Sequence, residues 1–187
     1  MADERVADPG PLGLAGFAMT TFALSSANAH LWSGAGVAAA LGLAFFYGGT
    51  VQLLAGMWEF VRKNTFAALA FSSYGAFWLS FYALEKFNLP GGGTDTVGIF
   101  LLSWTIFTLY MTVAATKVTT AVLTVFVLLS ITFIFLTIGN WGAGHTGLVK
   151  IGGWTGIATA AAAWYASAAG VINSTHGKVV LPVGPRG

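Results

Sequence analysis

Polar side chains inside apolar stretches are the first candidates for chemistry in this chain. Gln52 lies within FFYGGTVQLLAG, Asn140 ends FIFLTIGN, and Asn28 ends the first apolar stretch. In hydrocarbon, each of these amides must find hydrogen-bond partners or be strongly destabilising. Gln52 therefore either clasps neighbouring helices or gives a pore a polar lining, and the sequence leaves both interpretations open. Asn140 is more typical of a cap, because Gly139–Asn140 is a helix-ending pair.

A second candidate is the segment DPGPLGLAGFAMTTF at the start of the first apolar stretch. Proline fixes the backbone dihedral φ and is favoured in the first turn of a helix. The exposed amides of that turn lie at the positive end of the helix dipole, where a small anion can bind. Asp8 can instead accept from them as an N-cap, and we favour this interpretation. The residues concerned are Asp8, Pro9, Pro11, Leu12, Gly13 and Leu14.

Motifs for catalysis are absent from the sequence. There is no nucleophile elbow, H-E-x-x-H or P-loop, and cysteine is missing, which excludes thiolate catalysis. His30, His145 and His176 fall in loops or at the ends of apolar stretches, without metal-ligand spacing. We expect neither an enzyme nor a metal or other cofactor.

Ionisable side chains avoid the middle of every apolar stretch, and Glu59 lies only at the end of the second. Such groups at mid-membrane depth mark proton relays and retinal attachment. The pattern argues against a rhodopsin and against a side-chain proton relay. It also predicts no basic side chain at depth to compensate an anion.

Composition places the chain in a membrane. It has 187 residues, of which 56% are hydrophobic and 7% charged, whereas soluble domains carry about 25% charged residues. Lipid must therefore be its solvent and partner.

The basic residues are scattered singly, so we do not expect nucleic acid as a partner. The first ten residues lack the basic-then-apolar pattern of a cleavable signal, and the first span is expected to stay.

Six stretches approach the roughly 20 apolar residues that a membrane crossing requires. They predict an all-α membrane protein in which six transmembrane helices form a pore-containing bundle. The expected parts are an N-terminal segment over 1–10, a transmembrane domain over 11–176 and a C-terminal tail over 177–187. The expected spans are 11–28, 34–60, 64–84, 97–115, 119–138 and 151–172.

Basic residues predict the orientation. With six spans, only Lys86 and Lys150 fall on one side, and the other side receives Arg5, Arg62, Lys63, Lys117, Lys178 and Arg186. Because basic residues favour the cytoplasm, both termini are expected inside the cell (plasma or inner) membrane.

Small residues recur at four-residue spacing in two spans, at Gly34, Ala38 and Gly42 and at Gly152, Gly156 and Ala160. Such faces let helix backbones approach closely. We favour packing within one bundle, with contacts between protomers as the alternative.

The opening segment also resembles the N-P-A-P-L-G-L signature of the acetate uptake transporter family, the succinate–acetate permeases of bacteria and their fungal relatives. Further similar blocks cover most of the chain in the same order. They are FFYGGTVQLLAGMWEF, NTFAALAFSSYGAFWLSF, TIGN, GGWTGI and VVLPVG. Any one block alone is weak, but together they are specific.

This resemblance implies a six-helix protomer assembled as a hexamer, each protomer with its own path for acetate or a similar small carboxylate. It also implies a hydrophobic constriction of Phe17, Tyr74 and Leu129, the last placed only by counting back from TIGN. Asp8 stands where the family signature has Asn. A carboxylate there should repel an anion, unless its main role is capping, which we favour.

The implied substrate limits the mechanism. Dehydrating a lone carboxylate in apolar surroundings is very costly, so either the protonated acid crosses or polar groups solvate the anion. Suitable polar groups are Thr20, Thr21, Gln52 and Asn140. We expect no buried carboxylate or histidine, which favours a channel, or co-permeation with a proton, over a strictly coupled carrier, since such a carrier would need a titratable relay. The alternatives are a urea or short-amide channel of similar architecture and a non-transporting membrane scaffold.

Overall fold

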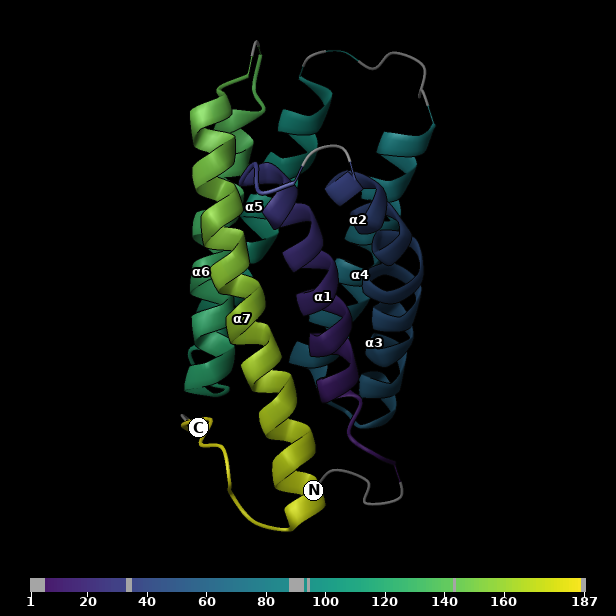
Figure 1. The fold of residues 1–187 in the computed structure, drawn as a ribbon. Coiled ribbons are helices and arrows are strands. Elements are labelled where there is room, and N and C mark those ends of the chain that lie inside the picture. The colour runs from purple at the N-terminus through teal and green to yellow at the C-terminus, as the bar shows by residue number, and fades with distance from the viewer. Residues whose placement is uncertain (1–5, 33–34, 88–92, 94, 143, 186–187) are drawn as a thin grey trace.

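The computed structural model describes residues 6–32, 35–87, 93, 95–142 and 144–185, and within these it contains helices and no strand. The elements are α1 (Gly10–Asn28), α2 (Ala35–Phe45), η1 (Phe46–Val51), α3 (Gln52–Val61), α4 (Thr65–Lys86), α5 (Thr96–Ala115), α6 (Thr120–Gly139) and α7 (Thr146–His176). Figure 1 shows them as a bundle of roughly parallel and antiparallel rods.

The elements α2, η1 and α3 follow one another without a break and form a single rod, so the described chain contains six rods. Five of the six are long and apolar enough to cross a membrane, including the composite rod over Gly36–Val61. The first and shortest, α1, has 19 residues. The predicted all-α membrane fold with six helices is confirmed.

Local sequence explains where several helices begin and end. Asn64 caps α4 by accepting a hydrogen bond from the amide of Ala67 at 3.2 Å. Thr119 caps α6 in the same way, and α7 ends at Gly177, whose φ of 62° is the left-handed conformation that glycine adopts readily. These caps satisfy amides and carbonyls that lipid cannot.

Neighbouring rods pack in a regular order: α1 against α7, α7 against α6, α6 against α5, and α3 against α4 (Figure 1). On α7, a Cβ built at Gly156 would lie 2.8 Å from the Cβ of Ser25, so only glycine lets α1 approach this closely. Gly152 packs against Leu136 of α6, and Ala160 is fully buried. This small-residue face therefore packs within the chain.

The other small-residue face is open. Ala38 and Gly42 are exposed, and a Cβ built at Gly42 would meet no atom within 4 Å. Gly34, which belongs to the same pattern, lies outside the described residues. Of the two predicted faces, only this one is free to meet another protomer.

The π-helical segment η1 lies beside α1. A Cβ at Gly48 would lie 2.7 Å from the Cβ of Thr20, so the two backbones meet closely here. Such π-turns often occur at functional sites. In this rod, η1 ends at Val51, and the next residue is Gln52.

The segment after α7 folds back over the bundle. The amide of Val180 donates to Asn173 Oδ1 at 2.7 Å, and Tyr165 Oη donates to the carbonyl of Pro182 at 2.7 Å. The amide of Thr120 donates to the carbonyl of Gly184 at 2.7 Å, so this segment also caps the start of α6.

Candidate functional site

Two cavities lie inside the bundle, one toward each end. The first, about 250 Å³ in volume, lies where α1 and α4 begin and α3 ends. The second, about 200 Å³, lies where α1, α4 and α6 end and α5 begins. Each volume exceeds the roughly 30 Å³ of one water molecule, so each cavity has room for a small solute.

Phe17 and Leu129 line both cavities and therefore stand between them. Tyr74 lines the first cavity, and its ring centroid lies 5.7 Å from that of Phe17. The exposed fractions of the three residues are 5% for Phe17 and 3% for Tyr74 and Leu129, so together they form a buried and largely apolar wall. The structure thus brings the three residues of the predicted constriction to the boundary between the two cavities.

Residues of α5 hold the Tyr74 ring in place. Its hydroxyl shares a 2.8 Å hydrogen bond with Thr108 Oγ1, and Thr108 is fully buried on α5. Phe107 meets the same ring edge-on at 5.3 Å. This support fixes the tyrosine side chain at the boundary, with its polar group satisfied.

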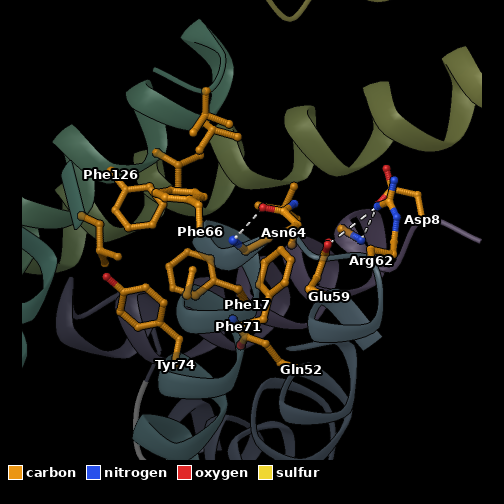
Figure 2. A pocket seen from close by; sticks show the side chains of 18 residues that line it. Asp8, Phe17, Gln52, Glu59, Arg62, Asn64, Phe66, Phe71, Tyr74 and Phe126 are labelled. Atoms are coloured by element: carbon orange, nitrogen blue, oxygen red, sulfur yellow. Dashed lines mark hydrogen bonds and ion pairs between the residues drawn. The ribbon is translucent and has the colours of Figure 1, made fainter. Parts of the chain in front are cut away.

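Gln52 lines the first cavity, and its side chain is completely buried (Figure 2). Neither Oε1 nor Nε2 has a hydrogen-bond partner among the described residues. The clasp between helices, one of its two interpretations, is therefore not formed in the described part of the chain. A buried amide with both groups free in a cavity is instead suited to bind a polar solute.

Charged side chains gather at the outer part of the first cavity. Glu59 is 1% exposed, its Oε2 lies 3.8 Å from Arg62 Nη1, and the same Nη1 forms an ion pair with Asp8 Oδ1 (Figure 2). One expectation is thus wrong, because the chain does bury a carboxylate. The reason is that the start of α1 covers the last turn of α3, and a Cβ at Gly10 would lie 3.6 Å from Glu59 Oε1. Arg62 follows the last residue of α3, so it places a basic side chain at the outer part of the cavity and not deep within a span.

The start of α1 differs in detail from the prediction. Pro9, with φ −78° and ψ −10°, is the N-cap residue and provides no side-chain cap. Asp8 Oδ1 accepts from the amide of Gly10 at 2.9 Å, and not from Leu12, Gly13 or Leu14 as expected. A capping side chain reaches only the amides two or three residues further along the chain, and Pro11 has no amide hydrogen, so Gly10 is the donor within reach. Asp8 therefore caps the turn and also pairs with Arg62.

The other predicted residues at the start of α1 differ in their surroundings. The carbonyl of Pro11 accepts from Ser167 Oγ at 2.7 Å, which joins α1 to α7. Gly13 faces the ring of Phe71 at contact distance, Leu12 is exposed, and Leu14 lines the first cavity.

The other predicted polar groups divide between the cavities and the packing. Thr21 and Asn140 line the second cavity, and Thr21 Oγ1 has no partner among the described residues. Asn140 Nδ2 donates to the carbonyl of Leu136 at 2.8 Å, in keeping with a cap of α6. Thr20 lines neither cavity, because its hydroxyl donates to the carbonyl of Gly16 at 2.8 Å and its side chain packs on Gly48. The geometry gives no support to Thr20 as a lining residue.

Several lining residues were missed by sequence reasoning. The first cavity is also lined by aromatic side chains, which Figure 2 shows. The second cavity is likewise lined by aromatic side chains. Helical spacing gives a signal for some of them, since Glu59 and Arg62 are three residues apart, as are Phe71 and Tyr74. The missed residues include Glu59, Arg62, Asn64, Phe66, Phe71 and Phe126 in the first cavity and Trp78, Glu85 and Phe133 in the second.

Comparison with known proteins gives consistent similarities. "Succinate-acetate/proton symporter SatP" of Escherichia coli strain K12 is 37% identical over 188 residues, which cover 98% of each chain. The "Glyoxylate pathway regulator" of Yarrowia lipolytica is 40% identical over 95% of this chain and 68% of its own, and "Acetate permease A" of Emericella nidulans is 38% identical over 96% and 66%. The chain thus spans about two thirds of these fungal relatives and nearly all of the bacterial one.

A solved structure agrees. "Structure of the bacterial acetate channel SatP" superposes with a TM-score of 0.89 at 36% identity, covering 96% of this chain and 99% of that one. Residues 1–185 match the GPR1/FUN34/yaaH family. The resemblance drawn from the sequence motifs is confirmed, and this chain belongs to the GPR1/FUN34/yaaH family.

Proposed function

We propose that this protein passes acetate and related small monocarboxylates, with succinate as a further substrate, across the membrane through a path within each protomer. The observation that carries the proposal is the pair of cavities on either side of Phe17 and Leu129. The relatives named as acetate or succinate–acetate transporters support this choice of substrate.

The apolar wall explains how such a path excludes water and ions. A ring of buried apolar side chains can close a pore by dewetting, without a moving lid. A carboxylate crosses such a ring only if it is protonated or if polar groups replace its water. Gln52 on one side and Thr21 on the other carry polar atoms that have no hydrogen-bond partner within the described part of the chain and could serve that purpose.

Charge movement distinguishes a channel from proton-coupled transport. The sequence favoured a channel because no buried carboxylate was expected, and Glu59 removes that argument. Passage of the anion alone builds up a membrane potential, whereas passage with a proton does not. A potential-sensitive dye in protein-containing vesicles separates the two mechanisms.

We also propose that the protein is a hexamer in the plasma or inner membrane, with both termini in the cytoplasm. The open face of α2 around Ala38 and Gly42 supports an oligomer, since exposed small residues allow close helix contact. The cytoplasmic placement rests on the distribution of basic residues, of which Arg5 and Arg186 lie outside the described residues. In this proposal, 1–10 and 177–187 are cytoplasmic segments that flank a transmembrane domain over 11–176.

Solute uptake into vesicles tests the proposal. Purified protein is reconstituted, and uptake of labelled acetate, succinate and urea is compared with that of empty vesicles. The proposal expects acetate uptake above the empty control and little urea uptake. Urea uptake without acetate uptake would favour the amide channel, and no uptake of any solute would favour the scaffold.

A further inference from the structure

The charged side chains that line the first cavity include more acids than bases. Of the described residues that line this cavity, Asp8 and Glu59 are acids, and Arg62 is the one base. Both carboxylates approach the same nitrogen, Arg62 Nη1 (Figure 2). The side chain of Glu59 is 1% exposed, whereas that of Asp8 is 54% exposed and lies at the mouth of the cavity. Asp8 is therefore the partner that an incoming solute meets first.

Arg62 retains donor capacity on its other edge. Its Nε is buried and has no hydrogen-bond partner among the described residues. A guanidinium group presents five N–H donors in a fork that matches the two oxygens of a carboxylate. A buried charged donor without a partner indicates a ligand, and Arg62 is one of the residues that line the cavity.

We propose that Arg62 binds the substrate carboxylate at the mouth of the first cavity and that Asp8 is an internal competitor for it. The Asp8 carboxylate has the same chemistry as the substrate, so in this structure it stands in for the ligand on Arg62. Its negative charge also repels a second carboxylate that approaches the Nε edge. The inference rests on the proposed function, because it takes the substrate to be a small carboxylate.

The two contacts of Asp8 separate its two roles. Its Oδ1 accepts from the amide of Gly10, which stabilises the start of α1, and it pairs with Arg62 Nη1. Asparagine, which the family signature has here, keeps the acceptor but loses the charge. Asp8→Asn thus removes the negative charge that competes for Arg62 and leaves the cap, whereas a role in capping alone predicts no effect of this change.

The test measures the concentration of acetate that half-saturates exchange of labelled acetate in vesicles. The variants are Asp8→Asn, Arg62→Gln, the double variant and Arg62→Lys, which keeps the charge without the fork. Lys117→Gln is the matched control, because Lys117 is exposed near the same end, beside Val118, and does not line the cavity. Thermal stabilisation by sodium acetate, relative to sodium chloride at equal ionic strength, reports binding independently of transport.

We expect Asp8→Asn to lower the half-saturating concentration about three- to fivefold, the range for one partly exposed charge. Arg62→Gln should raise it about tenfold or more, as for a lost hydrogen bond to a charged group, with Arg62→Lys between. The effect of Asp8→Asn should disappear in the double variant, because it acts through Arg62.

The inference is overturned if Asp8→Asn acts equally with and without Arg62, or if Arg62→Gln changes no more than Lys117→Gln. Acetate stabilisation that depends on Arg62, without exchange by the unchanged protein, would defeat the proposed transport and keep the site. Exchange by the unchanged protein that does not depend on Arg62 would defeat the site and keep the proposed transport.

Discussion

Truncation of Phe17 to alanine should join the two cavities and widen the range of solutes that pass. The ring stands between spaces of about 250 and 200 Å³, and 5% of the residue is exposed. Removing it opens a connection between the two cavities of the proposed path. We therefore expect faster acetate uptake and a larger ratio of succinate to acetate uptake than in the unchanged protein.

The cost in stability should be small for a buried aromatic residue. Phe→Ala in a fully packed core typically costs about 3–5 kcal/mol. Phe17 already borders empty space on two sides, so fewer packing contacts are lost, and we expect a cost below about 3 kcal/mol. The oligomer should remain intact by size-exclusion chromatography.

Met111→Ala is the matched control for this prediction. Met111 is 2% exposed on α5 and lines neither cavity. Its truncation should lower thermal stability without changing the uptake ratio. If Phe17→Ala assembles normally and leaves both rate and ratio unchanged, or if Met111→Ala changes them equally, the constriction lies elsewhere.

Three further predictions concern the path and the orientation. Tyr74→Phe should lower stability by about 1 kcal/mol, because the bond to Thr108 is lost while the ring still fills the boundary; denaturation and uptake assays check it, and a large change in selectivity would contradict it. Gln52→Leu should reduce acetate uptake in vesicles without lowering thermal stability, because it removes two polar atoms without partners among the described residues; unchanged uptake would show that the amide contacts no substrate. An impermeant amine label applied to intact cells should leave Lys178 unmodified, and its modification from outside would reverse the proposed orientation.

The helices were predictable because lipid imposes a strong pattern. Each span needs a long apolar run, so charged and turn residues mark the ends within a few positions, as at Asn64 and Thr119. The π-helical segment η1 was not predictable, since no hydrophobic period distinguishes it from the α-helices on either side. Its glycines are explained only by the neighbours that they allow to approach.

The apolar part of the candidate site was predictable from family motifs, and the charged part was not. Phe17 and Tyr74 lie within two of the sequence blocks that together resemble the family, and the structure places them at the boundary. Glu59 and Arg62 lie at the end of a span, where sequence position alone predicts exposure to water. Their burial depends on how the start of α1 covers α3, a contact between residues about 50 positions apart in the sequence. The acceptor role of Asp8 was expected, but its partner was placed too far along the helix, because a capping side chain at this position reaches only the amide of Gly10.

The central claim, that acetate passes between Phe17, Tyr74 and Leu129, is tested most directly by blocking that point. Leu129 is 3% exposed and lines both cavities, so Leu129→Trp places an indole ring between them. The measurement is labelled acetate uptake by vesicles that contain the assembled fraction of this variant. We predict uptake close to that of empty vesicles. Uptake at the rate of the unchanged protein would show that acetate takes another route.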